Sequence, residues 1–301
     1  MTLFEDLDRR LLPGFRRQSV DTGEGPVQTL IAGDGPPVLM LHGDPQTHLC
    51  WHGIAPELAR SRTVVLTDLR GRGESHKPGP TEDHAPYTKR AMAAEQVAVM
   101  EHFGFSTFAV VGHDRGARVA RRMALDHPDI VERLVVMDIV PAIDFYEQTN
   151  AAIAQDYYYF FFLTQPRPIA ERLIAGDPER FMGQILTGLP GATAPYDPDA
   201  FALYLKASGT AEAITAMCEC FRAGRTRDIE IDRMDRRHGN TIECPTLVMW
   251  GANGVMGQYF DIRAIWTSWA PAARFRAMDC GHFIPEEAAR ETTEILKDFL
   301  A

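Results

Sequence analysis

The stretch that decides the fold runs from Val110 to Ala120 and reads VVGHDRGARVA. An apolar run leads into a Gly-x-x-x-Gly frame, and residues that suit a helix follow it. The two glycines allow a tight turn in which the backbone of the central residue is strained. The pattern therefore predicts a strand, a sharp turn and a helix, with the carboxylate of Asp114 at the turn. An isolated Asp-x-x-Gly would instead indicate a helix N-cap, but the complete frame favours the turn.

Short apolar bursts that end in Gly, Asp or Pro recur along the chain. They lie at 36–43, 63–71, 107–114, 133–141 and 244–251. Such runs are typical of parallel strands that are buried on both faces. Helical patterns at 89–104 and 116–128 separate them, and this alternation predicts βαβ units. A last strand-like run at 273–282 precedes a closing helix at 286–300.

The interval from 142 to 225 differs from the rest of the chain. It is helical in pattern and rich in aromatic residues at 155–166, and a Gly- and Pro-rich break follows at 187–200. We expect it to form a helical cap over the carboxyl ends of the strands, where ligands bind in open α/β sheets. The predicted organisation is a core of residues 1–141 and 226–301 with a cap of residues 142–225.

Composition narrows the class of protein. The chain has 301 residues, of which 45% are hydrophobic and 24% charged, which fits one α/β domain with an insertion. The net charge of −10 and the lack of a basic cluster disfavour nucleic acid as a partner. No apolar run approaches the roughly 18 residues of a membrane span. Five scattered cysteines without zinc-site spacing, and an N-terminus without a signal-peptide pattern, predict a reduced cytoplasmic protein with no metal or other cofactor.

Asp114 indicates a particular reaction. Many hydrolases carry a serine in this frame, whereas a carboxylate is a competent nucleophile at saturated carbon and would form an alkyl ester. Water must then attack the ester carbonyl, which requires a general base and an oxyanion hole. His282 follows the last predicted strand in DCGHFIPEE and is the candidate base. The chain order nucleophile, acid, histidine is that of α/β-hydrolases.

The acid that orients the histidine has several candidates. The usual position after the penultimate strand holds Asn253, which cannot serve. Asp138 ends the apolar strand VVMDIVP, where a carboxylate needs a partner such as an imidazole. We therefore favour Asp138 over Asp261 and Asp279.

Two further features complete the predicted site. The loop that begins at His42-Gly43-Asp44-Pro45 follows a strand and can supply one backbone N–H to the oxyanion hole, with the N–H of Arg115 as the second. Arg115 and Arg118 lie three residues apart in the first turn of the helix, where two cations are unfavourable unless an anion is bound. The pair predicts a clamp for a substrate carboxylate. The alternative is that these arginines pair with surface acids such as Asp126 or Asp129.

Taken together, these motifs resemble the haloacetate dehalogenase family of α/β-hydrolases, which includes the fluoroacetate dehalogenases. The resemblance runs from about residue 30 to the C-terminus and rests on HGDPQTHLCWHGIAPELA, DLRGRGESHKP, GHDRGARVARRMALDHP, MDIVP, FFLTQP and GHFIPEE. It implies a mostly parallel eight-stranded sheet with an inserted helical cap. It also implies Asp114 as nucleophile, Asp138 and His282 as the acid–base pair, and a small carboxylate substrate held by the two arginines. Dimers are common in this family, so the resemblance is compatible with a homodimer, although the sequence itself does not give the oligomeric state.

The cap departs from the family pattern. The His-Trp pair that holds the departing halide falls on Tyr159 and Phe160, and the later cap tyrosine falls on Phe221. Three hydrogen-bond donors become one, which disfavours release of fluoride because each such donor is worth about 2.7–4 kcal/mol. Asp44, where an aromatic residue is common, adds a negative charge beside the nucleophile, and Trp51 of the same segment is a further candidate pocket residue.

These changes leave rival functions open. In the related epoxide hydrolases a cap tyrosine protonates the oxirane oxygen, and Tyr159 occupies the matching position, although those enzymes usually use two tyrosines. Most aromatic residues at 157–162 are otherwise expected to pack within the cap. A ligand-binding protein on a hydrolase fold is a third hypothesis. It is disfavoured because nucleophile, acid, base and oxyanion loop are all present.

Overall fold

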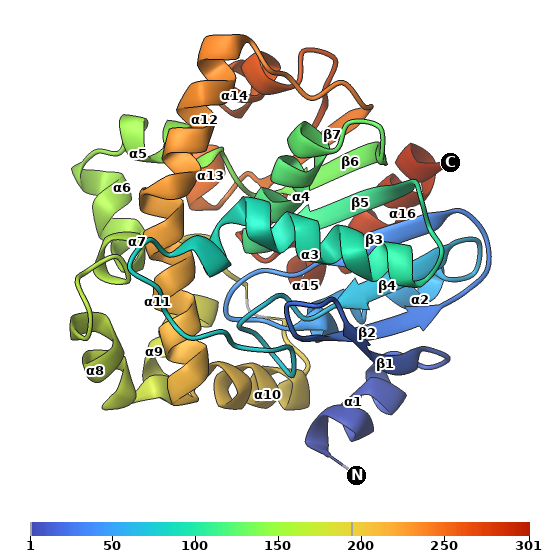
Figure 1. The fold of residues 1–301 in the computed structure, drawn as a ribbon, viewed down its shortest axis with the longest axis horizontal. Coiled ribbons are helices and arrows are strands. Elements are labelled where there is room, and N and C mark those ends of the chain that lie inside the picture. The colour runs from blue at the N-terminus through green and yellow to red at the C-terminus, as the bar shows by residue number, and fades with distance from the viewer. Residues whose placement is uncertain (1, 194) are drawn as a thin grey trace.

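A computed structural model describes residues 2–193 and 195–301. Its centre is a sheet of eight strands (Figure 1). The strands are β1 (Arg16–Asp21), β2 (Pro26–Ala32), β3 (Pro37–Leu41), β4 (Thr63–Thr67), β5 (Phe108–His113), β6 (Val131–Met137), β7 (Thr246–Gly251) and β8 (Arg274–Met278). Their order is β1-β2-β4-β3-β5-β6-β7-β8, with β2 antiparallel to both of its neighbours and every other pair parallel. The mostly parallel eight-stranded sheet expected from the resemblance is confirmed.

The central strands explain the continuous apolar runs in the sequence. Leu39 of β3 lies opposite Val65 of β4 and Val110 of β5, and all three side chains are fully buried. Both faces of these strands are covered by helices, so neither set of alternating side chains contacts water. Outside this centre, the edge strand β1 is mostly polar and partly exposed, and β2 contains the buried polar residues Gln28 and Thr29, so neither strand is a continuous apolar run and the sequence pattern did not predict them.

Helices cover the sheet on both faces. Outside the stretch between β6 and β7 they are α1 (Leu3–Leu11), η1 (His48–Trp51), α2 (Ala55–Leu58), η2 (Ala85–Tyr87), α3 (Lys89–His102), α4 (Arg115–Asp126), α13 (Val255–Tyr259), α14 (Ile262–Trp269), α15 (Ile284–Glu287) and α16 (Ala289–Leu300). In Figure 1, α3 and α4 lie in front of the sheet and α16 lies behind it. The predicted closing helix is divided into α15 and α16.

The stretch between β6 and β7, here called the helical segment, stands to one side of the sheet (Figure 1). It contains α5 (Ala142–Gln148), α6 (Ala151–Asp156), α7 (Tyr158–Phe162), α8 (Ile169–Ala175), α9 (Pro178–Thr187), α10 (Pro198–Ser208), α11 (Ala211–Arg225) and α12 (Arg227–His238). Helices therefore continue beyond the predicted end of the cap at residue 225. Of the predicted break at 187–200, residues 188–193 and 195–197 lie between α9 and α10, residues 198–200 begin α10, and residue 194 lies outside the described residues. The division into core and cap stays a prediction.

The helices and the cysteines of the structure bear on the expectations about membrane spans and disulfides. None of the described helices combines the length and the apolarity that crossing a membrane requires. All five cysteines are free. The cytoplasmic location and the homodimer stay predictions.

Candidate active site

Asp114 lies on the turn between β5 and α4, with φ 46° and ψ −116°. A positive φ is costly for a residue with a side chain and is held here by its surroundings. A Cβ on Gly116 would lie 2.2 Å from the carbonyl oxygen of Leu41, and one on Gly112 would lie 2.6 Å from the backbone of Ala117. Both glycines are therefore required by close packing of the backbone, and the turn presents the carboxylate of Asp114 at the carboxyl end of the sheet.

His282 lies between two carboxylates. Its Nε2 is 3.8 Å from Oδ2 of Asp114, and its Nδ1 is 2.5 Å from Oδ2 of Asp138. The other oxygen of Asp138 accepts the N–H of Gly251 at 2.9 Å. The arrangement gives Nδ1 the proton, which it donates to Asp138, and leaves Nε2 facing Asp114.

The rival acids lie elsewhere. The carboxylate of Asp261 caps α14 by accepting the N–H of Ala264, and Asp279 accepts a hydrogen bond from Asn253. Of the three candidates, the structure brings Asp138 to His282.

Charges around the nucleophile keep it ionised. Burial alone would raise the pKa of Asp114, but the cations of Arg115 and His282 and the N–H of Asp44 lower it to about 2. Burial alone would lower the pKa of His282, whereas the hydrogen bond and charge of Asp138, together with the charge of Asp114, raise it overall. Asp114 is thus charged at neutral pH, and its charge is one of the causes that raise the pKa of His282.

The loop of residues 42–47, here called the oxyanion loop, reaches the nucleophile through its backbone. The N–H of Asp44 donates to Oδ1 of Asp114 at 3.0 Å. The N–H of Gly116 donates to the carbonyl of His42 at 3.0 Å, which ties the loop to the start of α4. The predicted contribution of the loop therefore has the expected geometry at Asp44.

The side chain of Asp44 corrects one expectation. Its carboxylate makes a two-pronged ion pair with Arg72, in which Nη2 of Arg72 lies 2.7 Å from Oδ2 and Nε contacts Oδ1. Both side chains are buried. Because Arg72 balances its charge, Asp44 does not add a net negative charge beside the nucleophile, and the expectation of one was wrong.

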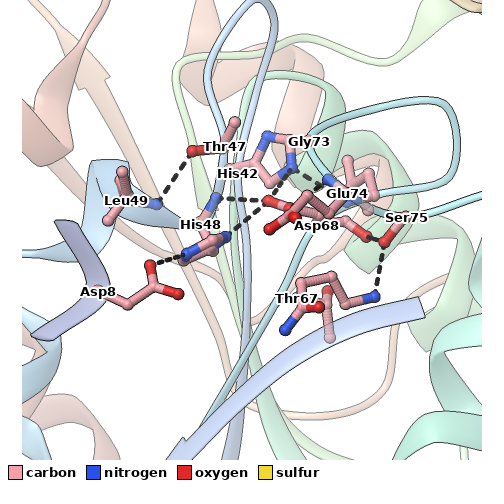
Figure 2. Close-up of polar contacts among 12 residues, drawn as sticks. Asp8, His42, Thr47, His48, Leu49, Thr67, Asp68, Gly73, Glu74 and Ser75 are labelled. Carbon is pink, nitrogen blue, oxygen red and sulfur yellow. Dashed lines mark hydrogen bonds and ion pairs between the residues drawn. The ribbon is translucent and has the colours of Figure 1, made fainter. Parts of the chain in front are cut away.

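A buried hydrogen-bond network contacts both ends of the oxyanion loop (Figure 2). His48 donates from Nδ1 to Asp68 and from Nε2 to Asp8, each at 2.8 Å. Burial lowers the pKa of His48, but the two carboxylates outweigh it and raise the pKa to about 9. Asp68 also accepts the N–H of His48 at 3.0 Å, and the ring of His42 accepts the N–H of Leu69 at 3.0 Å. The loop is thus fixed at one end by the backbone N–H of Leu69, which donates to His42, and beyond its other end by the carboxylates of Asp8 and Asp68, which hold His48.

The two arginines of the predicted clamp are buried beside the nucleophile. Nε of Arg115 is 3.9 Å from Oδ1 of Asp114, and its guanidinium lies 3.8 Å from the ring centre of Phe221 and 4.7 Å from that of Phe160. Nε and Nη2 of Arg115 and Nε of Arg118 have no hydrogen-bond partner within the described residues. Burial and the charge of Arg115 lower the pKa of Arg118 to about 10.

The alternative partners of these arginines are engaged or distant. Asp126 pairs with Arg90 and Arg122, each at 2.8–2.9 Å, and Asp129 is exposed. The clamp arginines instead line a small cavity of about 20 Å³, enough for about one water molecule. Its polar lining includes Lys89, Arg121, Arg122, Tyr146, Asp228 and Asp232. Sequence reasoning missed these residues because they come from four separate elements.

The aromatic residues named from the cap pattern gather next to the clamp. The rings of Phe160 and Phe221 meet edge to face at 5.0 Å, and Tyr159 lies edge-on to Phe221 at 6.1 Å. Trp51 is fully buried on η1 and belongs to the hydrophobic core, so its predicted contact with substrate stays a prediction. Tyr157 belongs to the run at 157–162, most of which was predicted to pack within the cap. Its hydroxyl lies 3.4 Å from Nδ1 of His282, a contact that the run of six aromatic residues concealed.

Comparisons with known proteins agree with this geometry. A family model described as alpha/beta hydrolase fold matches residues 36–289. The chain is 40% identical over 293 residues to a fluoroacetate dehalogenase of Burkholderia sp., covering 97% of this chain and 95% of that protein. It is 30% identical over 295 residues to a soluble epoxide hydrolase of Corynebacterium sp. (strain C12), covering 97% and 96%. The crystal structure of ALR0039 from Nostoc sp. PCC 7120 superposes with a TM-score of 0.93 at 43% identity, covering 97% of this chain and 99% of that one.

Proposed function

The chain belongs to the alpha/beta hydrolase fold family and is a hydrolase, and on that premise we propose that it acts through a covalent ester between Asp114 and a small carboxylate substrate. The observation that carries the proposal is the 3.8 Å separation of Asp114 Oδ2 and His282 Nε2, with Asp138 bound to the far side of the imidazole. A nucleophile, a base and an acid that orients the base then act in sequence. Residues 142–225 form the cap that excludes water from the site.

The two oxygens of Asp114 have different roles in this scheme. Oδ1 accepts the N–H of Asp44 and becomes the ester carbonyl oxygen, because that N–H also stabilises the negative charge that develops there when water attacks. Oδ2 attacks the substrate carbon, and the leaving group departs with the electron pair of its bond to that carbon. Water held by His282 then attacks the carbonyl carbon of the ester, and the hydroxylated acid is released.

The charge of Asp114 also determines at which step His282 can act as a base. Ester formation removes the negative charge of Asp114, which is one of the contributions that raise the pKa of His282. The imidazole therefore loses its proton more readily once the ester exists, and it becomes a base at the step that needs one.

The clamp defines the substrate class. Arg115 and Arg118 are buried cations with unpartnered N–H groups, and a substrate carboxylate satisfies both. A 2-haloacid with chloride or bromide as leaving group is the first candidate. Fluoride needs strong hydrogen-bond donors on leaving, and Phe160 and Phe221 donate none, so defluorination is disfavoured.

An epoxide hydrolase is the second candidate, and a specific observation favours it. Tyr159 lies against Phe221, whose ring contacts the Arg115 guanidinium beside the nucleophile. A phenol near the nucleophile can protonate an oxirane oxygen as the ring opens.

A single-turnover experiment in heavy-oxygen water tests the ester. The assay compares chloroacetate, fluoroacetate and a panel of epoxides by the release of halide or diol. The mass of the Asp114 peptide is then measured after turnover of each active substrate. Water attacks the carbonyl carbon, so we expect heavy oxygen in the carboxyl group of Asp114. Turnover that never labels this peptide would exclude the covalent scheme.

A further inference from the structure

The geometry points to a substrate that carries an oxirane ring and a carboxylate in one molecule, a 2,3-epoxy acid, with Tyr157 and Tyr159 as the donors to the ring oxygen. This inference rests on the Asp114 ester of the proposed function and names its substrate class. It also assigns a role to Tyr157, which sequence reasoning had left to packing.

Tyr157 has a hydroxyl proton to donate. Its oxygen is 3.4 Å from Nδ1 of His282, but that nitrogen already holds Asp138 at 2.5 Å. The longer contact is weak, because hydrogen bonds of this kind are centred near 2.9 Å. The side chain is 1% exposed and stacks on Phe160 with ring centres 5.0 Å apart. The phenol is thus fixed beside the catalytic imidazole while its proton remains available.

Tyr159 provides the second donor on the adjacent side of the site. Its ring meets that of Tyr157 edge to face at 5.4 Å and that of Phe221 at 6.1 Å. The ring of Phe221 in turn packs against the guanidinium of Arg115, whose Nε is 3.9 Å from Oδ1 of Asp114. The two phenols come from one short stretch of the chain and lie next to groups that flank Asp114: the hydroxyl of Tyr157 contacts the imidazole of His282, and the ring of Tyr159 packs on Phe221, which covers the guanidinium of Arg115.

Phenols suit an oxirane better than a halide. Opening the ring produces an alkoxide, which is strongly basic and needs a proton, whereas chloride and bromide leave as ions. Burial and the charge of nearby carboxylates, including Asp114, raise the pKa of both tyrosines well above the ordinary value of 10. Both phenols keep their protons at neutral pH and are ready to donate.

The clamp requires the carboxylate in the same molecule. Arg118 is 6% exposed, and no described acidic group lies within 4 Å of it. A neutral epoxide would leave this buried cation and the free N–H groups of Arg115 unpaired after the site closes, which is unfavourable. A carboxylate on the carbon next to the ring would pair with them and would place the ring between Asp114 and the tyrosines.

The atoms balance as hydrolysis. Oδ2 of Asp114 bonds to a ring carbon, the carbon–oxygen bond of the ring breaks, and its electron pair goes to the ring oxygen, which takes a phenolic proton. Water then adds to the ester carbonyl carbon and gives a proton to His282. The alkyl oxygen leaves as a hydroxyl, protons return to the phenolate and the product, and the result is a 2,3-dihydroxy acid with free Asp114.

The test compares three substrates on the full chain. They are 2,3-epoxypropanoate, the neutral 1,2-epoxypropane, and chloroacetate. We expect kcat/KM for 2,3-epoxypropanoate to exceed that for 1,2-epoxypropane by at least about a hundredfold, because only the epoxy acid makes charged hydrogen bonds with the two arginines. Equal rates for the two epoxides would overturn the inference.

Substitutions separate the donors from packing residues. Tyr157→Phe and Tyr159→Phe should each lower kcat for 2,3-epoxypropanoate by about a hundredfold, in the range of general acid catalysis. The factor by which kcat falls for 2,3-epoxypropanoate should be at least about ten times the factor by which it falls for chloroacetate. Tyr158→Phe is the matched control, because Tyr158 is 43% exposed and should retain wild-type rates. Equal losses on both substrates would mean a packing role and would contradict the assignment.

The failure of this inference can be told from failure of the proposed function. In the His282→Gln variant, 2,3-epoxypropanoate and chloroacetate should each form an ester that increases the mass of the Asp114 peptide. An adduct with chloroacetate alone would overturn the epoxy-acid assignment and leave the ester mechanism standing. No adduct with any hydrolysed substrate would overturn the ester mechanism and, with it, the inference.

Discussion

Oδ2 of Asp114 faces Nε2 of His282 at 3.8 Å, while Oδ1 of the same carboxylate accepts the N–H of Asp44 at 3.0 Å. The gap on the histidine side is longer than a hydrogen bond, so the two charged groups are close without being tightly joined. A water molecule or a substrate carbon can approach Oδ2, whereas Oδ1 is held by the backbone. This asymmetry is the basis of the ester mechanism that we propose.

Removing the nucleophile should abolish turnover. Asp114→Asn keeps the shape of the side chain but loses its charge, and we expect kcat to fall by about a thousandfold or more, as for other catalytic nucleophiles. Steady-state release of product from the preferred substrate measures the loss. Asp129→Asn, an exposed carboxylate on the same protein, is the control and should keep full activity. Turnover in the Asp114 variant near the wild-type rate would rule out the residue as nucleophile.

The two chemical steps should depend differently on pH. Asp114, with a pKa of about 2, is ionised throughout the working range, so ester formation should be flat from pH 5 to 9. Ester hydrolysis needs neutral His282, so below the pKa of this group in the ester the step should slow about tenfold per pH unit. Rapid quenching followed by mass measurement of the Asp114 peptide should therefore find the ester accumulating at low pH. A pH-independent level of ester would contradict the assignment of His282 as base.

Arg118 should strengthen the binding of carboxylate substrates and lower the stability of the free protein. In Arg118→Leu, KM for carboxylate substrates should rise by about ten- to a hundredfold, the worth of a charged hydrogen bond, while KM for neutral epoxides changes little. Because the buried cation has no acidic partner within 4 Å among the described residues, its removal should raise the melting temperature of the free protein. Arg122→Leu is the control. Arg122 pairs with Asp235 at 2.5 Å, so this substitution should lower the melting temperature. Equal KM effects on charged and neutral substrates would refute the clamp.

The ion pair of Asp44 and Arg72 offers a test of charge balance. Arg72→Leu leaves a buried carboxylate without its partner, which should cost about 3–5 kcal/mol of unfolding free energy. Adding Asp44→Leu should restore most of that loss, because both charges are then gone. Arg60→Leu, whose guanidinium is exposed and pairs with Glu57, should cost under about 1 kcal/mol. Urea unfolding measures the wild type, Arg72→Leu, Asp44→Leu, the double variant and Arg60→Leu. A loss in the double variant equal to the sum of the losses in Arg72→Leu and Asp44→Leu would show that the two charges do not interact.

Glu286 should make stability decline with pH. Its carboxyl accepts from Tyr204 at 2.7 Å and Gln46 at 3.1 Å, but burial dominates and raises the pKa from 4.5 to about 8. Between these two values the folded protein holds a proton that the unfolded chain has released, so the free energy of unfolding falls as pH rises, by up to about 1.4 kcal/mol per pH unit.

Glu286→Gln removes this titration. Its melting temperature relative to wild type should increase from pH 5 to pH 8 and then level off. Thermal unfolding across that range measures the difference, with the exposed Glu294→Gln as control. A difference that stays constant with pH would mean that Glu286 is ionised alike in both states.

Local sequence patterns were sufficient for much of the architecture. The frame around Asp114 could be read directly because its glycines are demanded by contacts within a few residues and by the neighbouring strand. The central strands could be predicted from their continuous apolar runs, because these strands are buried on both faces. β1 and β2 lack such runs, because β1 is a partly exposed edge strand and β2 carries the buried polar residues Gln28 and Thr29. Features that follow from backbone geometry or from burial of a whole strand leave a local trace in the sequence.

The chain itself determined the alternation of strands and helices, the strained turn with Asp114, and the histidine after the last strand. Only the tertiary structure decided that Arg72 neutralises Asp44 and that Tyr157 reaches His282. The physical reason is that charge and hydrogen-bond partnership depend on which side chains meet after folding. Arg72 is 28 positions from Asp44 and His282 is 125 from Tyr157, so no local pattern records either contact.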